Sequence, residues 1–199
     1  EYAAHWKDAT ESESRNSWYS ALAEAAFMTG LERNSDVVNM ASYAPLFAHV
    51  EAWQWRPDLI WFDNLSSIGT PNYYVQKLFS NNKGTDVVPI TENEKPVTGK
   101  DSLYSSAVID RQKGELVIKI VNIASTTQTV ELNLTGVKLG KTDAVMQTLA
   151  ANDLYSYNQL SELDKLKPEE RKFSLKKNKF DQNLPAYSVT VLKIPFTNK

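Results

Sequence analysis

Several residue types and motifs are missing from this 199-residue chain, and each absence excludes a kind of chemistry. There is no cysteine, which excludes disulfide scaffolds, zinc sites made of thiolates and cysteine nucleophiles. Histidine occurs only at His5 and His49, so we expect both to serve the hydrogen-bonded structure. The P-loop, GxGxxG, HExxH and GxSxG motifs are missing as well. We therefore expect neither a metal nor a cofactor.

The chain also has no long apolar run and no excess of positive charge. No run approaches the roughly 20 apolar residues of a membrane-spanning helix. With 22 Lys and Arg against 24 Asp and Glu, the net charge is −2, which does not favour a nucleic-acid partner. The first six residues, Glu1 to Trp6, include neither an initiator methionine nor a secretory signal. We expect the chain to be a processed product or a piece of a longer protein.

The residues that are present divide the chain into two halves. All five tryptophans lie between Trp6 and Trp61. Residues 1–84 carry 6 basic and 10 acidic side chains, and the remainder carries 16 basic and 14 acidic ones. Both properties change near the turn-rich sequence that ends at Gly84. We place a domain boundary there.

The first half has the pattern of an α/β protein. Residues 15–34 are apolar nearly all round, which predicts a helix packed on two sides. Residues 37–44 form a short apolar run that ends at Pro45, which is typical of a strand buried on both faces. Thr70 followed by Pro71 predicts the start of a second helix, with Thr70 as its N-cap.

The second half alternates apolar and polar residues, which is typical of half-buried strands. Turns at Gly114, residues 125–126 and Gly136 separate these runs. Many short strands of this kind predict an antiparallel β-sandwich. The expected strands are residues 86–91, 103–110, 116–122, 129–134, 142–149 and 187–194.

A charged stretch at residues 160–182 mixes lysines with acidic residues. Mixed signs of this kind are typical of a solvated loop or helix face. A site for an anionic partner or for another protein is the alternative interpretation.

Candidate chemistry is confined to carboxylates and aromatic residues in the first half. Trp53, Trp55 and Trp61 surround Arg56 and Asp58, in a loop expected to follow a buried strand. Tryptophan faces stack on sugar rings, and a carboxyl group can act as an acid or a nucleophile in glycoside hydrolysis. The alternative is that these aromatic residues only cap a core.

A family resemblance makes the interpretation more specific. The chain contains, in order, EYA at 1–3, ALAEAAFMTGLERNSDVV at 21–38, MASYAPLF at 40–47, WRPDLI at 55–60 and GTPNYYVQ at 69–76. These blocks closely resemble the α-L-arabinofuranosidases of glycoside hydrolase family 51. LPAYSV at 184–189 resembles the closing strand of that family's C-terminal domain.

The resemblance implies a mixed fold. Residues 1–84 would be the C-terminal part of a catalytic (β/α)8 barrel, from the end of strand seven through helix eight. Residues 85–199 would be an antiparallel, all-β sandwich domain. A partial barrel would expose apolar faces, so we expect it to dimerise, rearrange or pack against the sandwich.

The resemblance also implies a retaining glycosidase whose nucleophile is Glu1. Tyr2, Trp53, Trp55 and Asp58 would line the sugar pocket. The family's acid/base glutamate lies upstream of Glu1, so this chain alone should be inactive. The expected substrates are terminal α-L-arabinofuranosyl groups of plant polysaccharides or oligosaccharides.

Localisation and assembly follow only by analogy. Enzymes of this type are commonly secreted or periplasmic, and the family is often oligomeric. No nucleic acid or membrane is expected as a partner. The alternative function is a non-catalytic β-sandwich, serving as a structural or carbohydrate-binding module. The lack of tryptophan in the second half favours a structural role for that module.

Overall fold

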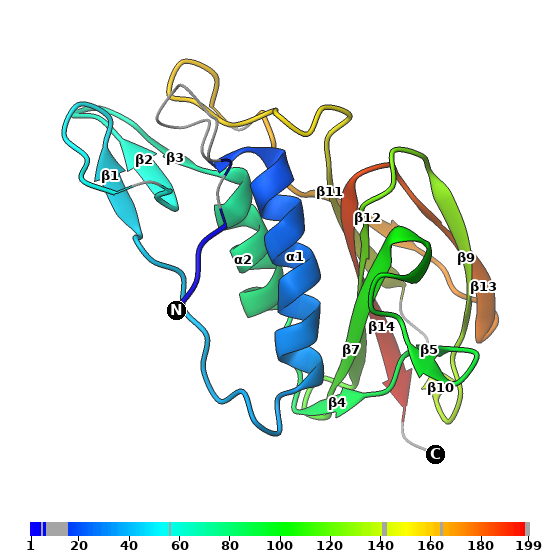
Figure 1. Ribbon diagram of the computed structural model, residues 1–199. Helices are drawn as coiled ribbons and strands as arrows, with labels where there is room; N and C mark the ends of the chain where they lie inside the picture. The colour runs from blue at the N-terminus through cyan, green and yellow to red at the C-terminus, as the bar shows by residue number, and fades with distance from the viewer. Residues whose placement is uncertain (5, 7–15, 56, 141–142, 164, 198–199) are drawn as a thin grey trace.

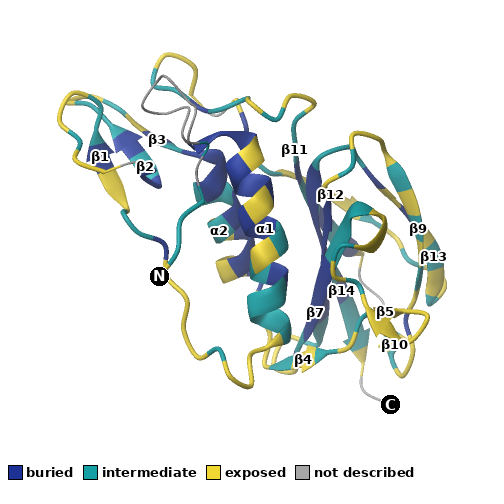
Figure 2. Cartoon of the chain, viewed as in Figure 1, coloured by how far each residue is buried: buried dark blue, intermediate teal, exposed yellow. Residues whose placement is uncertain are grey.

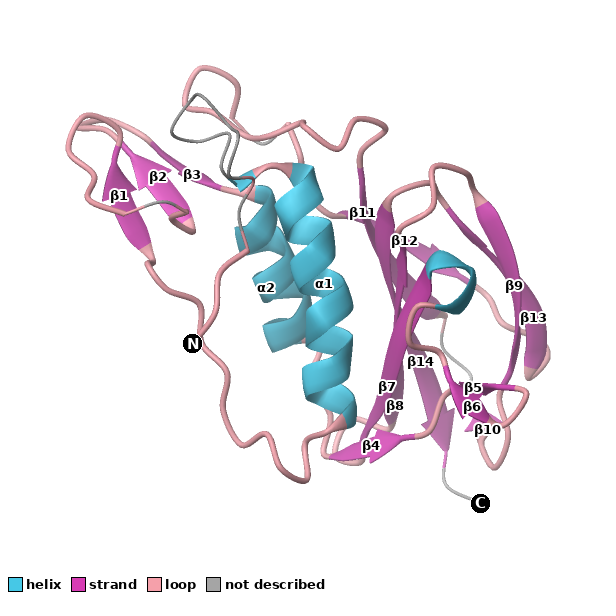
Figure 3. Ribbon diagram, viewed as in Figure 1, coloured by secondary structure: helices cyan, strands magenta, loops and turns pink. Residues whose placement is uncertain are grey.

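The computed structural model describes residues 1–4, 6, 16–55, 57–140, 143–163 and 165–197. Two helices lie side by side against one face of a large antiparallel sheet. A small three-stranded sheet lies near the N-terminal ends of the helices, on the side away from the large sheet (Figure 1). A second, two-stranded layer covers the opposite face of the large sheet (Figure 3). The helices are therefore sandwiched between the main sheet and the N-terminal segments.

Helix α1 spans Trp18–Arg33 and confirms the first predicted helix. It begins later than the pattern suggested, and Arg15 lies outside the described residues. Its buried face packs on the large sheet and on the second helix, while Tyr19 and Phe27 are about half exposed. The helix ends at Asn34, whose backbone N–H donates to Gly30 O at 3.2 Å.

Helix α2 spans Pro71–Asn81 and starts as predicted. The Thr70 hydroxyl accepts the Tyr73 N–H at 3.2 Å and donates to Leu59 O at 2.8 Å. Pro71 occupies the first turn, where its missing N–H costs no helical hydrogen bond. Val75, Leu78 and Phe79 are buried against α1 and the sheet.

The second half is mostly β-structure, and all six predicted strands have counterparts. The large sheet has the order β12-β11-β14-β8-β7-β4, with β10 pairing to β14, and every pairing in it is antiparallel. A two-stranded layer, β13-β9, and a small β5-β6 hairpin complete it. The strands are β4 Asp86–Val88, β5 Thr91–Glu92, β6 Lys95–Pro96, β7 Leu103–Asp110, β8 Glu115–Asn122, β9 Gln128–Asn133, β10 Lys138–Leu139, β11 Ala144–Ala150, β12 Glu169–Phe173, β13 Lys179–Leu184 and β14 Ser188–Thr197. A single-turn helix, Lys100–Ser102, precedes β7.

Strand β8 shows how the two layers share this sheet. Leu116, Ile118 and Ile120 face the core under β9 and β13, as their alternation predicted. The intervening Val117 and Val121 belong to the core that includes α1 and α2. The strand is therefore buried on both faces (Figure 2), rather than half-buried. Residues before and after Gly84 share one hydrophobic core in this way.

The predicted strand at residues 37–44 is wrong. Val37 lies in a turn, Met40 is 88% exposed, and only Tyr43 forms a bridge, in parallel with Tyr2. A strand becomes buried only when neighbours pair with it and pack on its faces. Among the described residues this segment has one such neighbour, at Tyr43, which is buried, whereas Val37 and Met40 remain in solvent.

The aromatic loop and the charged stretch also differ from expectation. The loop contains a small sheet, in which β1 Phe47–His49 pairs in parallel with β2 Ile60–Phe62, and β2 pairs antiparallel with β3 Ser67–Gly69. The stretch 160–182 is largely solvated, and its described residues before 169 and between 173 and 179 are turns and loops, as predicted, but β12 and part of β13 also lie in it. Strand β12 lies at the edge of the sheet, where charged side chains are common.

Candidate functional site

The first residues of the chain lie beside the end of the 37–44 segment. Tyr2 forms a parallel bridge with Tyr43, and its backbone N–H donates to Ser42 O at 3.1 Å. Glu1, the predicted nucleophile, is exposed. Tyr2 and Tyr43 are followed by α1 and α2 respectively. The start of the chain therefore runs parallel to the segment around Tyr43, and each of these two segments is followed in the sequence by a helix.

The Tyr2 side chain is held on three sides. Its ring meets the Phe27 ring edge to face at 5.2 Å between centroids, and the Tyr43 ring at 6.4 Å. Its hydroxyl oxygen lies 3.0 Å from Oε1 and 2.9 Å from Nε2 of Gln76 on α2. Burial raises the pKa of the Tyr2 hydroxyl, and the charge of Glu24 adds to this rise. Tyr2 is therefore a fixed, neutral group next to Glu1.

Beneath Tyr2 lies a buried carboxyl group, Glu24, in the middle of α1. Its Oε1 accepts the Ala4 N–H at 2.8 Å, and its Oε2 accepts from Gln76 Nε2 at 3.1 Å. Burial raises its pKa to about 7, against the lowering effect of the Ala4 N–H and the Gln76 amide. A carboxyl group with a pKa near neutrality, close to a predicted nucleophile, is a feature typical of functional sites.

Asp58, predicted to line a sugar pocket, is instead buried, with 2% of its surface exposed. Its backbone N–H donates to Asn16 Oδ1 at 3.1 Å, and Asn16 Nδ2 donates to the Tyr43 hydroxyl at 2.8 Å. Burial raises the pKa of Asp58 to about 6, and burial raises that of Tyr43 as well. Asp58 Oδ2 has no hydrogen-bond partner among the described residues. The structure therefore connects Asp58 to Tyr2 through Asn16 and Tyr43, behind the exposed surface.

The two predicted tryptophans lie in the connection between β1 and β2. Trp55 is 65% exposed, so its face is open to solvent. Trp53 is partly buried, and its ring meets that of Trp61 at 6.5 Å between centroids. Trp61 is buried with Ala48 and Ile68 in the core of the small sheet. Trp53 and Trp61 thus fit the alternative of aromatic residues that cap a core, whereas Trp55 does not.

His49 is the histidine that the structure describes, and its contacts are local. His49 Nδ1 accepts the Glu51 N–H at 3.2 Å, and its ring meets Phe62 at 5.4 Å, which matches the expected structural role. His5 and Arg56 lie outside the described residues. Over the part of the chain that is described, no group of three or more acidic or histidine side chains is placed to hold a metal. No helix in that part is long and apolar enough to span a membrane.

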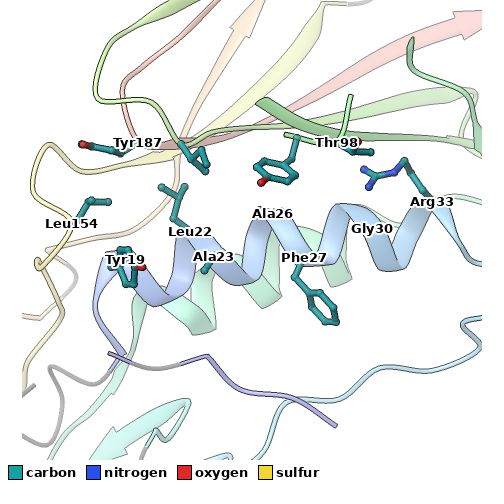
Figure 4. Close-up of a pocket in the computed structure, with 12 residues that line it drawn as sticks. Tyr19, Leu22, Ala23, Ala26, Phe27, Gly30, Arg33, Thr98, Leu154 and Tyr187 are labelled. Atoms are coloured by element: carbon teal, nitrogen blue, oxygen red, sulfur yellow. The ribbon is translucent and has the colours of Figure 1, made fainter. Parts of the chain in front are cut away.

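A groove of about 540 Å³ lies between α1 and the edge of the large sheet (Figure 4). Its lining is mostly apolar and includes Leu22, Tyr104 and Tyr187. Phe27 also borders it but points away from Thr98, on the other side of α1. None of the predicted site residues lines this groove.

Sequence reasoning missed Glu24 and Gln76, the two side chains that lie behind Tyr2. The signal for Glu24 was present, since it is a lone carboxylate in a helix segment that is otherwise apolar. It also missed a buried ion pair farther along α1, where Lys119 Nζ of β8 lies 2.5 Å from Glu32 Oε1. Lys119 alternates with Val117 and Val121 on the helix-facing side of β8, where a cation was not expected.

Comparison with known proteins identifies the family. Residues 1–188 match the family described as the α-L-arabinofuranosidase C-terminal domain. The chain belongs to this family. The resemblance given by the sequence blocks is confirmed, because relatives and structural neighbours are family 51 arabinofuranosidases.

Individual relatives agree in name and differ in coverage. The extracellular exo-α-L-arabinofuranosidase of Streptomyces chartreusis is 59% identical over 81 residues, which is 41% of this chain and 10% of that protein. The probable α-L-arabinofuranosidase A of Aspergillus terreus is 36% identical over 86% of this chain and 26% of its own length. α-L-Arabinofuranosidase 1 of Arabidopsis thaliana is 33% identical over 94% of the chain and 27% of its own length. The chain therefore spans about a quarter of the length of the two longer matches.

Solved structures agree with the fold. An arabinose-bound GH51 α-L-arabinofuranosidase superposes with a TM-score of 0.84 at 35% identity, over 92% of this chain and 28% of that one. The α-L-arabinofuranosidase of Thermotoga maritima, in an arabinose complex, gives a TM-score of 0.73 at 17% identity, over 95% and 40% respectively. The second likeness concerns the fold alone.

Proposed function

We propose that this chain is the C-terminal portion of a retaining α-L-arabinofuranosidase. Residues 1–84 are the closing segment of its (β/α)8 barrel, and residues 85–199 are its β-sandwich domain. The family match over residues 1–188 carries this proposal. The parallel bridge between Tyr2 and Tyr43, with α1 and α2 following, supports it because neighbouring parallel strands that each lead into a helix are the repeating unit of such a barrel.

Glu1 is the nucleophile in this proposal. Its carboxylate attacks the anomeric carbon of an arabinofuranosyl group while an acid on another part of the protein protonates the leaving oxygen. This gives a covalent glycosyl-enzyme, which water then hydrolyses with the acid group acting as a base. The two carboxyl groups of a retaining enzyme lie about 5 Å apart. The exposure of Glu1 next to the fixed ring of Tyr2 supports this role.

The proposed substrates are terminal, non-reducing α-L-arabinofuranosyl groups on plant polysaccharides or oligosaccharides. The names of the relatives and the arabinose in a related crystal structure support the sugar. Tyr2 and the open face of Trp55 are the groups proposed to contact it. Secretion is proposed from the relative that is named extracellular. Self-association of the protein also remains a proposal.

The sandwich has a structural role in this proposal. The face of its large sheet that would otherwise be open is covered by α1 and α2, which fits the expectation that the first half packs against it. The carbohydrate-binding alternative requires exposed aromatic residues on a sandwich face, and every tryptophan lies before residue 62.

Substitution of Glu1 tests the function. In the full-length protein, Glu1→Ala should lower kcat on an aryl α-L-arabinofuranoside by about 10³-fold or more. A small anion such as azide should restore part of the rate by occupying the space of the lost carboxylate. Retention of full activity by Glu1→Ala would overturn the assignment. Turnover by the 199-residue chain alone would overturn the expectation that its acid/base lies elsewhere.

A further inference from the structure

Among the described residues, Glu24 is a buried carboxylate that contacts the segment carrying Glu1, residues 1–4. It is 1% exposed and lies on α1, twenty-three residues after Glu1 in the sequence. A carboxyl group in such a place loses its hydration, and burial raises its pKa to about 7. An apolar side chain of similar size would avoid this cost. The groups that the Glu24 carboxylate contacts therefore indicate why a carboxylate is buried there.

Two contacts tie this carboxylate to the first four residues. Oε1 accepts the backbone N–H of Ala4 at 2.8 Å. Oε2 accepts from Gln76 Nε2 at 3.1 Å, and the Gln76 amide in turn holds the hydroxyl of Tyr2. The segment is thus fixed both through its backbone and through a side chain, on either side of Ala3. One contact holds Ala4 directly, and the other holds Tyr2 through Gln76.

The remaining contacts of this segment do not duplicate these two. The Tyr2 N–H donates to Ser42 O, which belongs to the exposed, irregular 37–44 segment. The Tyr2 ring makes edge-to-face contacts with Phe27 and Tyr43. These contacts limit the orientation of the ring but do not fix the distance between the backbone of residues 1–4 and helix α1. Glu24 and Gln76 come from the two packed helices α1 and α2. They therefore set the position of the segment relative to the rigid part of the fold.

We propose that Glu24 is a positioning residue for the nucleophile. It holds the backbone at Ala4 and, through Gln76, the hydroxyl of Tyr2, so that Glu1 stands at a fixed distance from the reacting sugar carbon. The inference rests on the proposed function, since it needs Glu1 to be the attacking group. Glu24 itself touches no substrate and is not a catalytic residue.

The test compares two substitutions of Glu24 in the full-length protein. Glu24→Leu removes both acceptors, and a displacement of about 1 Å at a reacting group can cost about 100-fold in rate. We expect kcat per folded molecule to fall by about 10- to 100-fold, with KM changed by less than about threefold. Glu24→Gln keeps an oxygen for the Ala4 N–H, and we expect it to restore most of the lost kcat.

Glu32→Gln is the matched control, because it alters a partly buried glutamate of the same helix whose partners among the described residues are Ser106 and Lys119, away from residues 1–4. It should lower the melting temperature and leave kcat within about twofold, since it does not touch the reacting geometry. If Glu24→Leu does not fold, Gln76→Leu and Tyr2→Phe break the same link at other points. Each should then lower kcat without a matching rise in KM.

Two outcomes separate this inference from the function on which it rests. An unchanged kcat in Glu24→Leu and in Gln76→Leu, with a melting temperature lowered as in Glu32→Gln, would make Glu24 a purely structural residue and overturn the inference. If Glu1→Ala is inactive in the same experiment, the proposed function still stands. If Glu1→Ala is active, the proposed function fails first, whatever the Glu24 variants show.

Discussion

Helix α1 carries two glutamates that are shielded from solvent to different degrees, and their partners differ: Glu24 is buried, whereas the Glu32 side chain is 16% exposed. Glu32, near the C-terminal end, has a cation as a partner. Its Oε1 lies 2.5 Å from Lys119 Nζ, and its Oε2 accepts from the Ser106 hydroxyl at 2.6 Å. Glu24, in the first half of the helix, accepts from neutral groups among the described residues, the Ala4 N–H and the Gln76 amide. Within that part of the chain, Glu32 has a cation beside it and Glu24 does not.

This difference separates a structural role from a positioning role. The Glu32 network holds α1 to β7 and β8, and desolvation lowers the pKa of Lys119 while Glu32 opposes that change. A buried ion pair of this kind fixes how a helix lies on a sheet. Glu24 has no such partner, so its burial reduces stability at neutral pH. Its position behind the Glu1 segment is the feature that accounts for keeping it.

Removing the cation should have the largest effect on stability. Lys119→Met leaves the partly buried Glu32 without its partner, and we expect a loss of about 3 kcal/mol, the low end of what breaking a fully buried pair costs. Urea unfolding of the chain would measure the change. Adding Glu32→Leu should restore much of the loss, because no unpaired charge then remains. A loss below about 1 kcal/mol in the single variant would mean that the pair does not hold the helix.

The pH dependence of stability should reveal the raised pKa of Glu24. The pKa of Glu24 rises from about 4.5 to about 7 on folding, so the folded state keeps a proton that the unfolded state loses. Its contribution is complete below pH 4.5 and is lost as pH rises to about 7, amounting to about 3 kcal/mol. Asp58, with a pKa raised to about 6, acts in the same direction at lower pH.

Glu24→Gln should therefore flatten the stability profile between pH 4.5 and 7, because an amide does not titrate. Chemical unfolding at a series of pH values would show this. Parallel profiles for the parent and Glu24→Gln would show that folding does not raise the pKa of Glu24, and would contradict this prediction.

A smaller effect is expected from the second partner of Glu32. Ser106→Ala removes a hydrogen bond to a charged group, which is worth about 2 kcal/mol. The Lys119 contact remains, so the loss should be less than that of Lys119→Met, and a combined variant should not be additive. Equal losses in the two single variants would indicate that the cation adds nothing beyond the hydroxyl.

The smallest loss of stability is expected at the N-cap of α2, which lies away from Glu24 and Glu32 and serves as a reference for the larger losses. Thr70→Ala removes the N-cap of α2, which should cost about 1 kcal/mol. Thr70→Ser keeps the hydroxyl and should retain most of the stability. Because no charge is involved, the loss should not vary between pH 4.5 and 7, which thermal unfolding at both values would test.

The sequence predicted those elements whose signal is local. The alternation at 103–110 matches β7, and Thr70 with Pro71 marks the start of α2, since strand faces and helix caps depend on nearby residues. The segment 37–44 carries the composition of a buried strand, but burial depends on neighbours that composition does not report. Strand β12 was missed because an edge strand can be charged throughout.

Site residues were predicted only where a motif named them. Glu1 and Tyr2 came from the family resemblance, and their roles remain proposals. Asp58 was predicted to line a sugar pocket, which stays a prediction; the structure shows it buried and linked to Tyr43 through Asn16. Glu24 and Gln76 were missed because their importance arises from the packing of α1 on α2, which brings together residues 52 positions apart.

The most direct test of the central claim is to label the full-length protein with a mechanism-based arabinofuranosyl reagent and to map the modified peptide by mass spectrometry. The account predicts a covalent sugar on Glu1. A label on another carboxylate, or an active protein that accepts no label, would contradict it and leave Glu1 without a catalytic role.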